Sequence, residues 1–70
     1  MIPLLLAPVG KEQIVKQVKG SDRTKLFMET LGFVPGSAVT VLSSHNGDLI
    51  VSVKDTRIAL NVETAAKIMV

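Results

Sequence analysis

The sequence predicts a mainly β protein: a small, partly closed antiparallel barrel with one short inserted helix and a C-terminal helical turn. Its 70 residues fit one domain, which we assign to residues 1–70. Five short apolar segments alternate with turn signals, and closing them into a barrel protects both sheet edges. Hydrophobic residues make up 47% of the chain, a high share for so small a domain. This surplus predicts a partner or a homo-oligomer.

Composition excludes several kinds of chemistry. The chain has no Cys, Trp or Tyr, and His45 is its one histidine. Disulfides and thiolate sites are therefore excluded, and a reducing compartment is expected. The formal net charge is +2, but the charge is uneven. Five basic residues stand against two acidic ones within residues 11–25, namely Lys11, Lys16, Lys19, Arg23 and Lys25 against Glu12 and Asp22.

The first half of the chain predicts two strands and a helix. Met1–Val9 reads as an apolar first strand that packs on the barrel, or alternatively one that adds to another subunit's sheet. No basic residue precedes its apolar run, so it does not match a signal peptide. Gln13–Lys19 reads as a strand with a bulge, because its apolar residues do not alternate strictly. Ser21 is a good N-cap for a helix over Asp22–Leu31, and Gly32 is its expected stop.

The second half predicts a three-stranded meander. Phe33-Val34-Pro35-Gly36 forms a turn, and Asn46-Gly47 is the strongest hairpin signal in the chain. The other expected elements are strands at Ala38–Leu42, Leu49–Lys54 and Arg57–Leu60, a turn at Asp55-Thr56, and a helical turn at Val62–Ile68 after the capping residue Asn61. Both phenylalanines, Phe27 and Phe33, are expected to be packed. The predicted core is Leu4, Leu6, Ile14, Val18, Leu26, Leu31, Val39, Val41, Val51, Val53, Ile58, Leu60 and Ile68.

The ordered set of motifs resembles the ferrous iron transport protein A family. Its best piece is Leu31-Gly32-Phe33-Val34-Pro35-Gly36, followed by the strand Val39–Leu42. Ile58-Ala59-Leu60 and the spacing of the C-terminal residues also match, and Gly10 and Ile14 fit the first loop and second strand. The chain departs from the family at Asp48-Leu49-Ile50, where a Pro is common, and at Asp55-Thr56, where Gly and an aromatic are common. The resemblance implies an SH3-like barrel.

The same resemblance implies a non-enzymatic accessory of bacterial ferrous iron uptake. Such proteins act in the cytoplasm, at the inner face of the membrane, by docking to the ferrous iron transporter with its cytosolic GTPase domain. The resemblance also associates the chain with transition metal ions. A similar SH3-like module occurs in metal-dependent repressors related to the diphtheria toxin repressor, so a stand-alone regulatory relative of that module is an alternative.

The candidate functional residues belong to a docking surface. We expect Leu5, Phe33 and Val34 to supply apolar contacts, and Lys16 and Arg23 to supply basic ones. A homo-oligomer would use the first strand or the Phe33-Val34 turn.

No cofactor and no catalytic residue is expected. The carboxylates fall in separate elements, no phosphate-binding loop is present, and His45 with Asp48 makes an incomplete metal site. A nucleic-acid-binding barrel that uses the basic residues is the remaining alternative. It is disfavoured because base stacking needs a spare aromatic side chain, so no nucleic-acid partner is expected.

Overall fold

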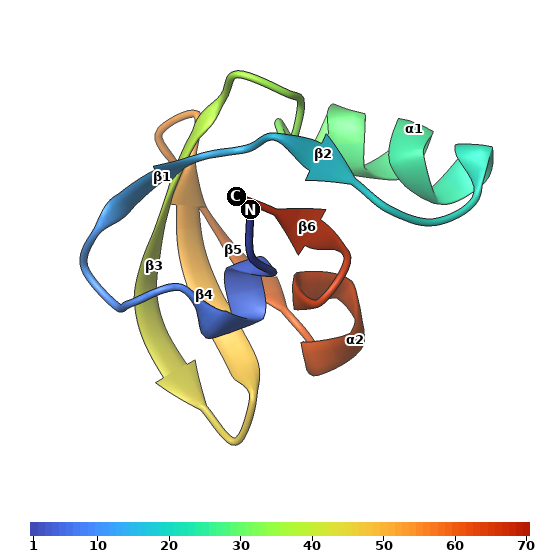
Figure 1. Cartoon of the computed structure of the whole chain (residues 1–70). Helices are drawn as coiled ribbons and strands as arrows, with labels where there is room; N and C mark the ends of the chain where they lie inside the picture. Colours follow the sequence, from blue (N-terminus) through green and yellow to red (C-terminus); the bar gives the residue numbers. More distant parts are fainter.

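Two antiparallel sheets form the body of the protein in a computed structural model that describes all 70 residues (Figure 1). The larger sheet has the order β1-β3-β4-β5, and the smaller one pairs β2 with β6. The strands are β1 (Glu12–Ile14), β2 (Gln17–Val18), β3 (Ala38–His45), β4 (Asp48–Val53), β5 (Thr56–Leu60) and β6 (Ile68–Met69). The helices are a 3-10 turn η1 (Leu4–Leu6), α1 (Asp22–Thr30) and α2 (Val62–Ala65). The predicted mainly β fold is confirmed.

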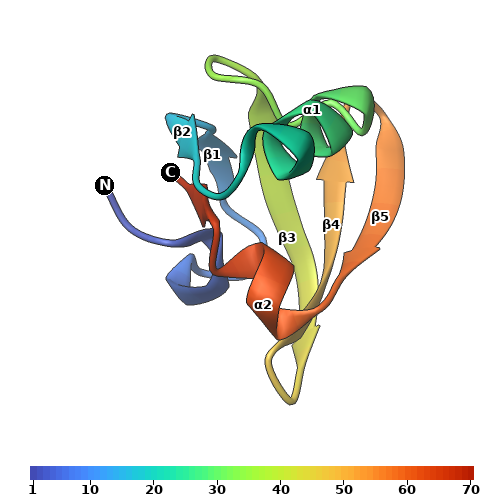
Figure 2. The same ribbon diagram turned by 90° about the vertical axis from the view of Figure 1, so that its right-hand side faces the viewer.

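The meander β3-β4-β5 carries most of the core. Alternate residues of β4 point inward, so Leu49, Val51 and Val53 are buried while Ile50 is exposed. The pairing of β3 with β4 shifts register between Val41 and Ser43, which marks a β-bulge. The sheet curls around the core and is covered by η1, α2 and β6 (Figure 2).

Two tight turns join the strands of the meander. Asn46 (φ 52°) and Gly47 (φ 88°) form the predicted hairpin turn with two positive φ angles. The second turn is formed by Lys54 (φ 51°) and Asp55 (φ 61°), one residue earlier than predicted. The prediction missed this because neither residue is a glycine, although both adopt the left-handed conformation that favours glycine.

The N-terminal segment is not a strand, so the prediction for Met1–Val9 is wrong. Its one β-bridge joins Pro3 to Met69, and the chain then turns through η1. The turn is closed by bonds from Leu6 N to Pro3 O (2.9 Å) and from Ala7 N to Leu4 O (3.0 Å). Pro3 and Pro8 lack the N–H groups that a strand ladder needs, which explains the failure of the strand pattern.

The predicted strand Gln13–Lys19 is divided into β1 and β2. The break lies at Val15 and Lys16, where the chain passes from one sheet to the other. Val15 N donates to Ser37 O, whereas Lys16 N donates to Met69 O, both at 2.8 Å. This corner explains why the apolar residues do not alternate strictly: Val15 and Val18 are both buried, and Ile14 is exposed.

Helix α1 confirms the predicted helix to within one residue. Ser21 caps it, because its side-chain oxygen accepts from Thr24 N at 3.2 Å. Only Met28 of this helix is buried. The helix therefore projects from the barrel (Figure 1), and the expectations that Leu26 is core and that Phe27 is packed are wrong.

The C-terminal helical turn is shorter than predicted and leads into a strand. Asn61 caps α2 through a bond from Thr64 N to Asn61 Oδ1 (2.8 Å). After α2, the strand β6 closes the smaller sheet, and Ile68, Met69 and Val70 are all buried. The sequence pattern did not predict β6, because a strand that is buried on both sides has no alternation.

The predicted core is right for eight residues. Those found buried are Leu4, Val18, Val39, Val41, Val51, Val53, Leu60 and Ile68. Leu31 and Ile58 are half-buried and pack against the core, while Leu6, Ile14 and Leu26 are exposed. The buried apolar residues that the prediction omitted are Ala7, Val15, Met28, Phe33, Leu49, Ala65, Met69 and Val70.

Candidate docking surfaces

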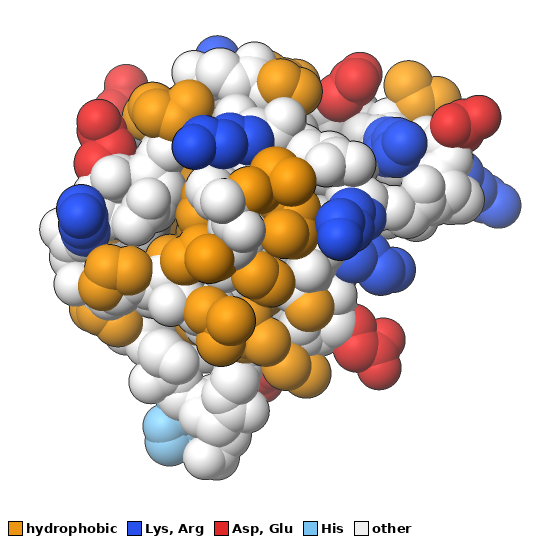
Figure 3. All heavy atoms as spheres, in the orientation of Figure 1, with side chains coloured by type: hydrophobic (Ala, Val, Ile, Leu, Met, Phe, Trp, Pro, Cys, Tyr) orange, Lys and Arg blue, Asp and Glu red, His pale blue; other side chains and the backbone are white.

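Hydrophobic side chains gather in the centre of one face, over the N-terminal segment and η1 (Figure 3). We call this the N-terminal face and define it by Met1, Ile2, Leu5, Leu6 and Val9. Leu6 is 68% exposed and Val9 is 56% exposed. The segment is nonetheless fixed in place, because Ile2 and Val70 exchange two backbone hydrogen bonds of 2.8 Å and Gly10 N donates to Val41 O at 2.7 Å.

Lysines border the N-terminal face. Lys16 lies beside β6, since its N–H donates to Met69 O. Lys19 N donates to Lys67 O at 2.8 Å, which continues the antiparallel register of β2 and β6. The backbones of Lys19 and Lys67 therefore lie opposite each other, just beyond the ends of β2 and β6. Lys11 comes two residues after Val9 in the sequence, directly after Gly10.

A second exposed apolar surface lies on α1. Leu26 and Phe27 are 62% and 61% exposed, and Arg23 precedes them by one helical turn. We call Arg23, Leu26 and Phe27 the α1 face. A hollow beside it runs between α1 and α2, lined by Arg23, Thr24, Phe27, Met28, Thr64 and Lys67. This hollow combines an exposed aromatic ring with two cationic side chains.

The expected docking residues do not form one exposed surface. Lys16 and Arg23 are exposed, and Leu5 and Val34 are half-buried. Phe33 is 1% exposed, which confirms that it is packed, so the other expectation, that it forms an apolar surface at its turn, is wrong. Whether the other four residues contact a partner stays a prediction. Phe27 was missed because it was taken for a packed residue, although its position one helical turn from Arg23 was available as a signal.

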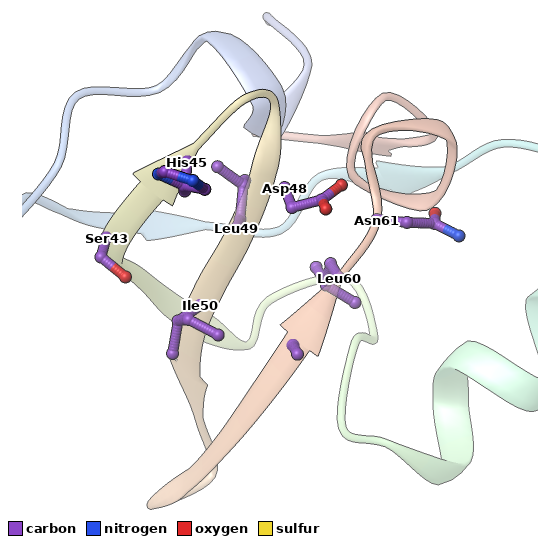
Figure 4. A pocket seen from close by; sticks show the side chains of 8 residues that line it. Ser43, His45, Asp48, Leu49, Ile50, Leu60 and Asn61 are labelled. Carbon is purple, nitrogen blue, oxygen red and sulfur yellow. The ribbon is translucent and has the colours of Figure 1, made fainter.

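His45 and Asp48 lie at a hollow near the tip of the β3-β4 hairpin (Figure 4). The Asp48 carboxylate points toward Asn61, away from the His45 ring. Its Oδ1 accepts a hydrogen bond from Val62 N at 3.2 Å, which supports the start of α2. No group of three His, Cys, Asp or Glu side chains in the structure could hold a metal ion. Asp48 thus has a structural role here.

These features define a small SH3-like domain whose exposed surfaces carry apolar and basic side chains. The chain belongs to the FeoA family, because the FeoA domain model matches residues 2–70. No helix in the structure has the length and apolar character needed to span a membrane.

Similar proteins support this assignment over the whole chain. A candidate Fe(2+) transport protein A of Methanocaldococcus jannaschii is 36% identical over 70 residues, which cover 100% of this chain and 85% of the relative. The crystal structure of an iron uptake regulatory protein (FeoA) has a TM-score of 0.87 and 29% identity, covering 97% of this chain and 90% of that one. Stenotrophomonas maltophilia FeoA, solved with zinc and described as a prokaryotic SH3 domain protein, has a TM-score of 0.83 and 27% identity, covering 99% and 88%.

A more distant likeness concerns the fold alone. A manganese-dependent transcriptional repressor matches with a TM-score of 0.83 at 17% identity, over 94% of this chain and 38% of the repressor. The predicted similarity to an SH3-like module of metal-dependent repressors is thus seen in the architecture.

Proposed function

We propose that this protein is a non-enzymatic accessory of ferrous iron uptake that docks to the cytosolic, GTPase-containing part of a membrane iron transporter. The observation that carries the proposal is the 36% identity to the archaeal Fe(2+) transport protein A over all 70 residues. The S. maltophilia relative is described in connection with the activation of ferrous iron transport, which supports the same role. The proposal places the chain in the cytoplasm, at the inner face of the membrane through its partner.

The α1 face is the surface best suited to this docking. It presents an aromatic and an aliphatic side chain on a helix that projects from the barrel, with Arg23 beside them. Exposed aromatic and arginine side chains are the residue types that most often dominate binding energy at protein interfaces. Lys16, Leu5 and Val34 remain proposed secondary contacts.

Docking would regulate the transporter without chemistry in this chain. A bound accessory shifts a conformational equilibrium only if it binds one state of the transporter more tightly than another. The basic side chains would speed the encounter with an acidic surface, and the apolar contacts would slow dissociation.

Calorimetric titration of the transporter's cytosolic domain with this protein tests the proposal. We expect saturable binding that Phe27→Ala weakens by at least tenfold, since it removes the aromatic anchor. Ile50→Ala is the matched control, because Ile50 is also exposed and apolar but lies on the outer surface of β4. Failure of the wild-type protein to bind, or equal effects of the two variants, would contradict the proposal.

Nucleic-acid binding is a second candidate, favoured by one structural observation. The sequence argument against it was the lack of a spare aromatic, yet Phe27 is exposed beside Arg23 and Lys67. A single ring can stack one base, whereas single-strand binders stack several. Salt separates the candidates: phosphate binding weakens with a log–log slope of roughly −0.7 to −0.9 for each contacted phosphate, whereas apolar docking responds weakly.

A further inference from the structure

We propose that the N-terminal face binds directly to the surface of an anionic lipid bilayer. This goes beyond the proposed function, because it requires no transporter and uses a different surface from the α1 face. The bilayer would contact the aliphatic side chains of the N-terminal face, and its anionic headgroups would contact the lysines that border it.

The apolar part of this surface is exposed but rigid. Leu6 lies at the end of η1, and its backbone N–H donates to Pro3 O. Its side chain is therefore exposed on a backbone that is held by hydrogen bonds. Val9 directly precedes Gly10, whose backbone N–H donates to Val41 O in β3. Because the backbone on which these side chains stand is already ordered, insertion into a headgroup layer costs little backbone conformational entropy.

The shape and chemistry of the face favour lipid over protein as its occupant. None of the four hollows on the protein surface is lined by a residue of the N-terminal face. Its side chains are all aliphatic or thioether, whereas protein interfaces rely on aromatic and arginine anchors and on pockets that receive them. A protruding aliphatic surface needs no complementary pocket when its partner is a fluid layer of acyl chains.

The charge around the face is complementary to anionic lipid. In Figure 3, basic side chains lie next to the hydrophobic side chains at the centre of the view, whereas the acidic side chains lie toward its edge. Lys16 belongs to the chain segment that is hydrogen-bonded to β6, because its backbone N–H donates to Met69 O, and its side chain is exposed. Each lysine close to such a surface strengthens binding by about fivefold at physiological salt.

Co-sedimentation with lipid vesicles tests the proposal on the full chain. We expect binding to vesicles of mixed phosphatidylglycerol and phosphatidylcholine, and much weaker binding to phosphatidylcholine alone. Leu6→Gln should weaken binding by about tenfold, because it removes one inserted aliphatic side chain. Leu26→Gln is the matched control, since Leu26 has nearly the same exposed fraction but lies on α1. Circular dichroism checks that both variants are folded.

A second pair of variants tests the charge. Lys16→Gln should weaken vesicle binding by about fivefold, whereas Arg57→Gln, which removes an equal charge from the exposed side of β5, should not. Raising the salt concentration should weaken binding of the wild-type protein.

Three results would overturn the proposal. They are equal binding to anionic and neutral vesicles, equal effects of Leu6→Gln and Leu26→Gln, and a dimer in sedimentation velocity that Leu6→Gln disperses while no vesicle binds. In the last case the N-terminal face joins two copies of this chain. None of these results bears on transporter docking, whose test uses Phe27 and contains no lipid.

Discussion

The backbone N–H of Phe33 donates to the carbonyl oxygen of Met28 at 3.0 Å, and both side chains are 1% exposed. Gly32 N donates to Glu29 O in the same turn, and Gly32 has φ 102°. This is a Schellman motif, in which the residue after the left-handed glycine makes an apolar contact with the last helical turn. It fixes α1 to the barrel at one end and leaves the α1 face free.

Met28→Ala should destabilise the protein by about 2–5 kcal/mol, because it leaves a cavity at the only buried position of α1. Chemical denaturation measures the change. Leu26→Ala, on the exposed side of the same helix, should change stability by less than about 0.5 kcal/mol. If Met28→Ala fails to fold, Met28→Leu should fold with a loss of less than about 1.5 kcal/mol. Equal losses for the two alanine variants would contradict the described packing.

Asp55→Gly should stabilise the protein by about 0.5–1 kcal/mol, because Asp55 holds a left-handed conformation that glycine adopts freely. The reciprocal change, Gly47→Asp, should destabilise it. In that variant a Cβ at position 47 would lie 3.2 Å from Val62 Cγ2, which is a tight contact. Thermal or chemical denaturation of both variants checks the prediction, and a loss of stability in Asp55→Gly would refute it.

Ser21→Ala should cost about 1 kcal/mol, because it leaves Thr24 N without its capping acceptor. Helical circular dichroism and the unfolding midpoint report the loss. Ser21→Asp restores an acceptor and places a negative charge at the helix N-terminus, so it should recover most of the stability. If Ser21→Asp is as unstable as Ser21→Ala, the cap does not contribute as described.

Titration with Fe(II) under anoxic conditions should give no saturable one-to-one site of micromolar affinity. The expected reason is that one histidine and scattered carboxylates supply too few ligands at any one place. The Asp48 carboxylate also accepts a hydrogen bond from Val62 N. A saturable heat signal that His45→Ala abolishes would contradict this prediction.

The sequence was sufficient to predict the elements that depend on local signals. The Ser21 cap, the Asn46-Gly47 turn and the alternation from Leu49 to Val53 each act within a few residues, and all three are present. What it could not predict depends on contacts between distant segments. Residues 1–9 are apolar enough for a strand, but their backbone partner is at the opposite end of the chain.

The α1 face illustrates the same limit. Leu26, Phe27 and Met28 are consecutive apolar residues, and only the direction in which the barrel holds the helix decides that Met28 is the buried one. The sequence alone therefore predicted that both phenylalanines are packed, which is right for Phe33 but wrong for Phe27, whose side chain is 61% exposed.

The paired hydrogen bonds between Ile2 and Val70 make the backbone almost a closed ring. The two ends lie side by side (Figure 1), so a short flexible linker could join them without moving either segment. New ends could then be opened at the exposed Asn46, far from the bonded termini in the sequence. Such a circular permutant would keep every strand pairing while changing the order in which the strands emerge during synthesis. It would also allow a label or tag to be attached at the hairpin tip, leaving the N-terminal face uncovered.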